Sequence, residues 1–274
     1  MGAAAHLNVS RSEEPAIRFH HVDASYGPYR ALFDLSFRVA AGSVKALLGA
    51  NGAGKSTVAR AATGLLSPTS GTITIGGVDA SKSEAYQVAR LGVAHVPEGR
   101  GIFAGLTVEE NLTLVFRQRL GRRRVEDAVS RVYDTFPVLR EQRHKRGNNL
   151  SGGQQRLLSL AGALVAPPKL LVADELSLGL APLVVEMVYD GLRQIHEAGT
   201  ALLIVEQQVD RVLEISDEAM VLDCGTLAYD GPAENAGQAM DRLLTSRRER
   251  NLVAHRDSST HVGPTAWNLE PTGL

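Results

Sequence analysis

The chain has 274 residues, 44% of them hydrophobic and 22% charged, and its formal net charge is −1 at pH 7. This length suits one large domain or two small ones, and the balanced charge excludes an overall positive field that attracts nucleic acid or acidic lipid. The single cysteine excludes an internal disulfide and fits a reducing compartment. No apolar run is long enough to cross a bilayer, and the start lacks the features of a secretion signal. We therefore expect a cytoplasmic protein that reaches a membrane only through partners.

The first part of the chain predicts an antiparallel β layer beside a central sheet. After a lead predicted to be flexible, 1–15, apolar and polar residues alternate in AIRFHHV (16–22) and LFDLSFRV (32–39), which is typical of half-buried strands. A buried strand is predicted in SVKALLG (43–49), and glycines bound a further short strand in GTITIGG (71–77).

The middle of the chain predicts helices. A capping box, Thr107 with Glu110, begins a helix in 106–120. A second helical pattern, RRRVEDAVSRVYDTF, ends near Pro137. Because this region is basic and lacks strand signals, we expect an inserted helical subdomain at about 103–165.

The last part of the chain alternates helices and strands. This alternation predicts a mainly parallel sheet covered on both faces. A polar tail, 246–274, has no usable period and is predicted to be disordered. The expected elements are a helix at 154–166 stopped by Pro167, a strand at 169–175, a helix at 181–199, a strand at 201–206 and a hairpin at 218–231 that turns at Cys224 and Gly225.

A phosphate-binding loop follows the apolar strand. GANGAGKS (49–56) fits G-x-x-x-x-G-K-[ST] between a strand and a helix, which is strong evidence for nucleotide binding. Backbone N–H groups of such a loop surround the phosphates, Lys55 reaches the β- and γ-phosphates, and the Ser56 hydroxyl binds Mg²⁺. The predicted nucleotide-binding residues of this segment are Gly49, Asn51, Gly52, Ala53, Gly54, Lys55, Ser56 and Thr57.

Two acidic residues end the strand LLVADE (170–175). Asp174 is placed where a carboxylate can hold Mg²⁺ through water. Glu175 follows directly and is the candidate to orient and deprotonate the attacking water. Taken alone, such a strand end is usually structural, but together with the phosphate loop it favours catalysis.

A different anion-binding helix start occurs in NLSGGQQR (149–156). Ser151 is a good N-cap and exposed N–H groups at a helix start attract phosphate, yet no lysine accompanies them. The order of phosphate loop, helical insert, LSGGQQ and LLVADE resembles the ATP-binding cassette (ABC) family over about 16–245. This resemblance implies a P-loop NTPase fold of the ABC ATPase type, with a mainly parallel central sheet, an antiparallel β layer and an inserted helical subdomain.

The resemblance also implies roles for individual residues. In this family two cassettes pack head to tail, and LSGGQ of one closes over the γ-phosphate held by the other. The residues that would contact the neighbour's ATP are Ser151, Gly152, Gly153 and Gln154. Tyr26 matches the aromatic residue that stacks on adenine, with Tyr29 as a rival. SLGL (177–180) matches a loop that touches the partner cassette, and Leu176 replaces a common proline before it.

Two departures from most cassettes indicate a branch of the family. Glu98, in VPEGRGIF, stands where most members carry a glutamine that contacts Mg²⁺. Gln207, in LLIVEQQ, stands where most carry a histidine that contacts the γ-phosphate, and it is a candidate catalytic residue. A decayed site is one interpretation. However, these motifs together resemble the ATPase subunits of branched-chain amino acid importers, in which this glutamate and glutamine are usual.

This branch implies an ATPase that powers uptake of branched-chain amino acids, or of urea or a short amide, with ATP and Mg²⁺ as ligands. The implied partners are a second, different ATPase chain, two membrane permease subunits and, through the complex, an extracytoplasmic solute-binding protein. A groove around Glu98–Phe103 would receive a permease helix. The alternatives are a soluble mechanical ATPase that acts on ribosomes or DNA, and an inactive structural subunit. The basic run at 139–147 lacks interleaved aromatics, so we expect no nucleic acid.

Overall fold

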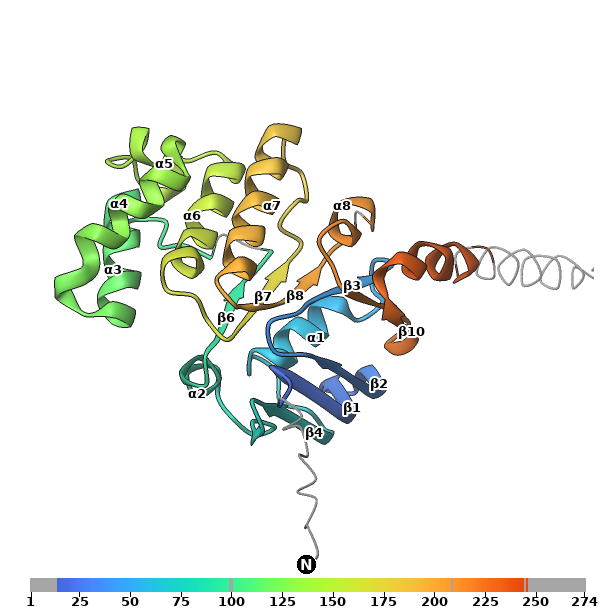
Figure 1. Cartoon of the computed structure of the whole chain (residues 1–274). Coiled ribbons are helices and arrows are strands. Elements are labelled where there is room, and N and C mark those ends of the chain that lie inside the picture. Colours follow the sequence, from blue (N-terminus) through green and yellow to red (C-terminus); the bar gives the residue numbers. More distant parts are fainter. Residues whose placement is uncertain (1–13, 99–100, 208, 244, 246–274) are drawn as a thin grey trace, which may run out of the picture.

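A computed structural model describes residues 14–98, 101–207, 209–243 and 245 of the chain. Two sheets and a group of helices form the fold (Figure 1). The predicted tail at 246–274 and nearly all of the predicted lead lie outside the described residues.

A six-stranded sheet forms the centre of the fold, in the order β10-β9-β3-β8-β7-β6. Its strands are parallel except at one edge, where β10 pairs antiparallel with β9. This confirms the mainly parallel sheet and the hairpin that turns at Cys224 and Gly225. The strands are β3 (Val44–Gly49), β6 (Val93–Val96), β7 (Leu170–Asp174), β8 (Ala201–Val205), β9 (Glu218–Asp223) and β10 (Thr226–Pro232).

A second, antiparallel sheet confirms the predicted β layer, in the order β2-β1-β4-β5. Its side chains alternate only approximately, because the register between β1 and β2 shifts at bulges. Asp34 adopts a left-handed φ of 51°, so buried Leu32 is followed by buried Leu35 after three residues rather than two. The strands are β1 (Ile17–Tyr26), β2 (Tyr29–Val39), β4 (Ser70–Ile75) and β5 (Val78–Asp79).

The helices occupy two regions of the molecule. In Figure 1, α3, α4 and α5 lie at the end remote from β1, β2 and β4, while α6 packs against α7. The predicted capping box exists, since Thr107 Oγ1 accepts from Glu110 N at 3.2 Å and Glu110 Oε2 accepts from Thr107 N at 2.7 Å. The helices are α1 (Lys55–Ala62), α2 (Ala85–Arg90), α3 (Val108–Leu120), α4 (Val125–Thr135), α5 (Pro137–Glu141), α6 (Gly152–Val165), α7 (Pro182–Glu197) and α8 (Val209–Leu213).

Both faces of the central sheet are buried, in two separate cores. Ala46 and Leu48 of β3 belong to the core that includes α6 and α7, whereas Leu47 belongs to the core with α1 and the antiparallel sheet. Fully buried strands of this kind explain the apolar runs in the sequence. The edge strand β6 is short, and our sequence prediction did not include it.

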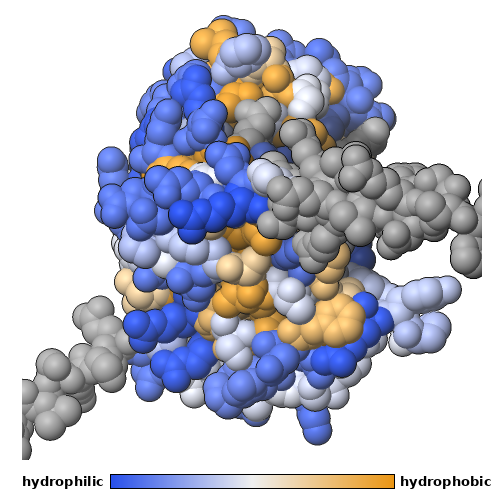
Figure 2. All heavy atoms as spheres, turned by 90° about the vertical axis from the view of Figure 1, so that its right-hand side faces the viewer, coloured by the Kyte–Doolittle hydropathy of each residue, from blue (hydrophilic) through white to orange (hydrophobic). Residues whose placement is uncertain are grey.

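None of the helices in the described residues combines the length and the apolar character that a bilayer span requires. On the face shown in Figure 2, hydrophobic side chains form small patches among hydrophilic ones.

A glycine in the middle of α7 tests the packing of this helix against α6. A Cβ atom at Gly191 would lie 2.8 Å from Leu160 Cδ2 and 3.0 Å from Phe136 Cζ, and both of these side chains are buried. Although alanine favours helices, we expect Gly191→Ala to lower the free energy of unfolding by about 1–3 kcal/mol through overpacking. Gly237→Ala is the control, because nothing lies within 4 Å of its added Cβ. Urea unfolding of both variants checks this, and equal stabilisation by both would contradict it.

Candidate nucleotide-binding and catalytic site

Three parallel strands deliver the candidate site residues to one edge of the sheet. Val205 of β8 pairs with Leu47 of β3 on one side and with Asp174 of β7 on the other. The three strands therefore end side by side, which brings the phosphate loop, the segment after β8 and the acidic end of β7 together. The carboxyl ends of parallel strands are the usual place for ligands in such sheets.

The backbone of the phosphate loop requires glycine at two points. Gly49 has a φ of 153°, and a Cβ atom there would lie 2.7 Å from Leu222 O. Gly54 has a φ of 106° and is the N-cap of α1. Asn51 and Gly52 are exposed at the loop tip and Ala53 is buried. Lys55, Ser56 and Thr57 form the first turn of α1, where free N–H groups favour an anion.

The side chain of Lys55 reaches from the first turn of α1 back to the start of the phosphate loop. Its side chain is buried, and Nζ donates to Gly49 O at 3.0 Å and to Ala50 O at 3.3 Å. Nζ also lies 3.6 Å from Glu175 Oε1. The structure thus brings the predicted phosphate-binding cation next to the predicted catalytic carboxylate.

Asp174 is a buried carboxyl with an unsatisfied oxygen. Among the described residues, its Oδ1 atom has no hydrogen-bond partner. Its pKa is raised to about 6, first by burial and then by the charges of Glu175 and Glu98, while the charge of Lys55 opposes the shift. A bound cation would pair with the unpartnered oxygen and offset the repulsion between the neighbouring carboxylates. The Oδ1 atom of Asp174 therefore suits a metal ligand.

A complete metal site is not formed by acidic and imidazole side chains alone. In the described part of the chain, no three His, Cys, Asp or Glu side chains converge to hold a metal ion. Ser56, Asp174 and Glu98 were predicted as partly water-mediated ligands. Mg²⁺ is often held by one or two protein oxygens with waters and substrate phosphates, so the absence of such a cluster is compatible with that ion.

Glu175 and Gln207 are brought together directly. Gln207 Nε2 donates to Glu175 Oε1 at 2.8 Å. Glu175 has a left-handed φ of 47°, and its N–H donates to Val205 O at 2.8 Å, which fixes the turn at the end of β7. One of the two amide hydrogens of Gln207 remains available for another acceptor.

Tyr26 lies next to the helix that follows the phosphate loop. Its hydroxyl accepts from Arg60 Nη1 of α1 at 3.4 Å, and its ring centre is 5.9 Å from the Arg60 guanidinium carbon. The ring is 40% exposed, whereas that of Tyr29 is 78% exposed. This placement favours Tyr26 over Tyr29 as the aromatic residue beside the loop.

Ser151 caps α6 as the sequence predicts. Its Oγ accepts from Gln154 N at 3.3 Å, and Gln154 Oε1 accepts from Ser151 N at 3.1 Å. The adjacent glycines differ, because a Cβ at Gly153 would lie 2.6 Å from Val184 Cγ1 whereas one at Gly152 has nothing within 4 Å. Packing inside this chain therefore accounts for Gly153, a reason that sequence reasoning missed, while the space beside Gly152 is open to a ligand.

Glu98 stands just after β6 and is exposed. Arg156 of α6 holds this segment, since its Nη1 donates to Pro97 O at 2.7 Å. Burial lowers the pKa of Arg156, and the nearby carboxylates oppose this shift. Those carboxylates are Glu98, Glu206, Asp174 and Glu175.

Sequence reasoning did not single out Arg156 or Glu206. Glu206 is only 2% exposed at the end of β8. The signal in both cases was a charged residue in an otherwise apolar element, since Arg156 begins the apolar part of α6 and Glu206 follows the apolar strand β8. Such residues are rarely buried unless they are paired or hydrogen-bonded.

The raised pKa of Asp174 has a measurable effect on stability. Because its pKa is higher in the folded chain than the ordinary 3.8, the ionised group destabilises the fold, and stability is lost as pH rises from about 4 through about 6. We expect Asp174→Asn to raise the free energy of unfolding by about 1–2 kcal/mol at pH 8, after allowance for solvent screening. The gain should shrink by more than half at about pH 4.5. Urea unfolding at both pH values measures it, with the exposed Asp190→Asn as control, and a gain independent of pH would contradict the expectation.

Comparisons with known proteins identify the family. A family model described as ABC transporter matches residues 32–177. The high-affinity branched-chain amino acid transport ATP-binding protein BraG of Pseudomonas aeruginosa is 37% identical over 237 residues, which cover 86% of this chain and 97% of that protein. The probable branched-chain amino acid transport ATP-binding protein LivF of Archaeoglobus fulgidus is 34% identical, with 79% and 92% covered. The Nod factor export ATP-binding protein I of Rhizobium meliloti is 35% identical, with 79% and 64% covered.

The fold is also that of solved cassettes. The ATP binding subunit of an ABC transporter superposes with a TM-score of 0.72 at 25% identity, and the alignment covers 79% of this chain and 90% of that one. A cassette in a dimeric post-hydrolysis state bound to ADP and Pi superposes with a TM-score of 0.72 at 20% identity, and the alignment covers 79% of this chain and 98% of that one. At that identity the likeness supports the fold alone. With the phosphate loop, the acidic strand end and the LSGGQ helix in place, the chain belongs to the ABC transporter family and is an ATPase that couples ATP hydrolysis to transport.

Proposed function

We propose that this ATPase subunit powers the uptake of branched-chain amino acids across the cytoplasmic membrane, from its inner face. The similarity to BraG and LivF over nearly the whole length of both supports this substrate class. The observation that carries the catalytic part is the group formed by Lys55, Glu175 and Gln207, in which Glu175 Oε1 lies 3.6 Å from Lys55 Nζ and 2.8 Å from Gln207 Nε2.

The proposed chemistry is attack of water on the γ-phosphate of ATP. The phosphate loop and Lys55 bind the phosphates, and Tyr26 stacks on the adenine. Glu175 orients the water and accepts its proton, while Gln207 holds Glu175 and directs its second amide hydrogen to the γ-phosphate. Ser56, Asp174 and Glu98 would hold Mg²⁺, which neutralises charge on the phosphates when it is bound.

A second cassette is proposed to complete each ATP site. The segment Ser151–Gln154 is a capped helix start with open space at Gly152, and it contains no cation that could bind a phosphate alone. We infer that this segment contacts the ATP held by the neighbouring cassette. In an importer of this class the neighbour is expected to be a different chain.

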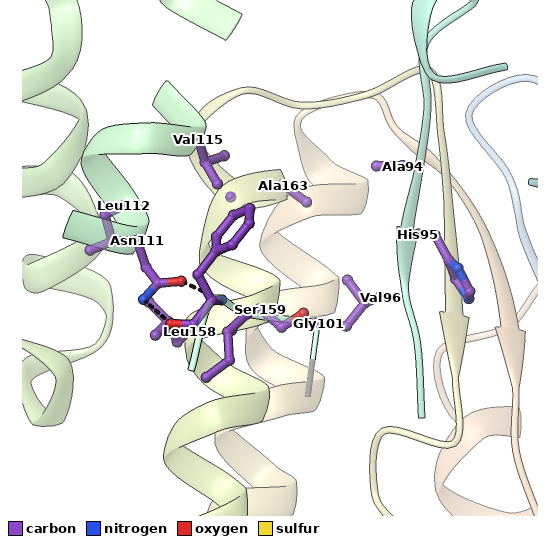
Figure 3. Close-up of a pocket in the computed structure, with 13 residues that line it drawn as sticks. Ala94, His95, Val96, Gly101, Asn111, Leu112, Val115, Leu158, Ser159 and Ala163 are labelled. Atoms are coloured by element: carbon purple, nitrogen blue, oxygen red, sulfur yellow. Dashed lines mark hydrogen bonds between the residues drawn. The ribbon is translucent and has the colours of Figure 1, made fainter. Parts of the chain in front are cut away.

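The contact with the permease subunits is proposed at a cavity between β6, α3 and α6 (Figure 3). The cavity is about 150 Å³ and includes Ile102 and Phe103, and Phe103 is 55% exposed. Asn111 fixes the edge, since its Oδ1 accepts from Phe103 N at 2.8 Å and its Nδ2 donates to Phe103 O at 3.0 Å. His95 points away from the cavity (Figure 3). An exposed aromatic residue on a fixed backbone beside a hollow suits a permease helix.

Replacement of Glu175 by glutamine tests the proposed base. Glu175→Gln keeps the shape but removes the proton acceptor, so we expect turnover of the assembled complex to fall by about 10²-fold or more. Binding of ATP by the variant should change less than about twofold. The control is the exposed Glu197→Gln at the end of α7. Normal turnover by Glu175→Gln would refute the assignment.

The transported solute is tested in the cell. The complex purified through this subunit should contain two permease chains and a second ATPase, and deletion of the subunit should abolish uptake of labelled leucine. Re-expression of the wild-type chain, but not of Glu175→Gln, should restore it. Loss of urea or short-amide uptake instead would move the assignment to that importer class, accumulation of a solute inside the cell would indicate export, and purification with ribosomes would favour the mechanical ATPase.

A further inference from the structure

Glu206 is a buried acid whose side chain accepts hydrogen bonds from the segments that follow β7 and β8. Its side chain follows β8, and three donors converge on it. Ser177 N donates to Oε1 at 2.9 Å, Ser177 Oγ donates to Oε2 at 2.9 Å, and Gln207 N donates to Oε2 at 3.3 Å. Both carboxylate oxygens therefore act as acceptors, and Ser177 is held through its backbone and its hydroxyl at once.

We propose that Glu206 is a positioning residue that sets the geometry of Glu175 and Gln207. This inference rests on the proposed roles of those two residues. Ser177 stands two residues after Glu175, and Gln207 follows Glu206. Because Gln207 Nε2 also donates to Glu175 Oε1 at 2.8 Å, the contacts form a closed ring from Glu175 through Ser177 and Glu206 to Gln207.

The chemistry of this ring requires a carboxylate. Burial raises the pKa of Glu206, and the hydrogen bonds from Ser177 and Gln207 oppose that shift. A buried acid is costly, so a residue that only filled this space would be more favourable as a neutral side chain. Glutamine has the same shape, but it offers one acceptor oxygen in place of two. The charge of Glu206 also interacts with that of Arg156 and opposes the lowering of the pKa of Arg156 by burial.

The ring also connects the reaction to an exposed loop. Ser177 is buried, but the next residue, Leu178, is 48% exposed, and Gly179 has a left-handed φ of 72°. A displacement of Leu178 would therefore move Ser177 and, through its two hydrogen bonds, the carboxylate of Glu206.

Two substitutions and their combination test the ring in the assembled complex. We expect Glu206→Gln to lower kcat for ATP hydrolysis by about tenfold or more, with the KM for ATP changed less than about twofold, because only orientation is lost. Ser177→Ala should act in the same direction. The double variant should be no more than about twofold slower than Glu206→Gln, because both substitutions break the same contact between Ser177 and Glu206. Glu197→Gln is the matched control and should behave as the wild type.

A structural readout keeps the test valid. In Glu206→Gln the backbone amide of Ser177 should exchange its hydrogen faster than in the wild type. The midpoint temperature of thermal unfolding should be equal to that of the wild type or higher. If Glu206→Gln fails to fold, Ser177→Ala with the same exchange and kinetic measurements carries the test.

Several outcomes would overturn the inference. Wild-type kcat in Glu206→Gln, a raised KM with unchanged kcat, or multiplicative losses in the double variant would each do so. Glu175→Gln is measured alongside: if it is inactive, such a result refutes only the role of Glu206, whereas an active Glu175→Gln refutes the proposed catalytic function itself.

Discussion

The arrangement of charge at the ends of three parallel strands governs this site. Asp174, Glu175 and Glu206 end or follow β7 and β8, and Lys55 follows β3. The sheet register fixes their mutual distance, because Val205 pairs with both Leu47 and Asp174. Burial, and then the charges of the neighbouring Glu175 and Glu98, raise the pKa of Asp174 to about 6. A site of this kind becomes favourable when phosphate, with its own counter-ion, occupies the space next to the lysine.

The two glycine-rich helix starts of the chain solve different physical problems. At α1 the backbone itself needs glycine, since Gly49 and Gly54 adopt positive φ values. At α6 neither Gly152 nor Gly153 does so, and Gly153 instead makes room for Val184. The first loop has a lysine beside its backbone N–H groups, whereas the second motif presents a capped helix start outward without a cation. This difference supports the proposal that the second motif contacts a phosphate held by another cassette.

Much of this organisation could be predicted from the sequence. The strands β3, β7 and β8 are mostly apolar because both sheet faces are buried, and this made the phosphate loop and Asp174 easy to place. The capping box at Thr107 and the N-cap at Ser151 are local and were predicted correctly, whereas the pairing of Ser151 with Gln154 in a second capping box was not predicted. The elements β6 and α2 were not predicted, because a four-residue strand and a six-residue helix have too few residues for a period to be recognised.

The contacts that could not be predicted all join segments far apart in the chain. The hydrogen bonds of Glu206 with Ser177 and of Arg156 with Pro97 span 29 and 59 residues. No local pattern indicates such a partner, although a charged residue in an apolar element indicates that one exists. The packing of Gly153 against Val184 was missed for the same reason.

A structure of the assembled complex with Glu175→Gln and bound ATP would show whether Lys55, Glu175 and Gln207 act together on the γ-phosphate. We expect Lys55 Nζ to leave Gly49 O for a phosphate oxygen and Gln207 Nε2 to contact the γ-phosphate. We also expect the LSGGQ segment of the neighbouring cassette to cover that phosphate. If ATP bound while Lys55 stayed on the loop carbonyls, or while Gln207 lay remote from the γ-phosphate, the three residues would not form the proposed catalytic group.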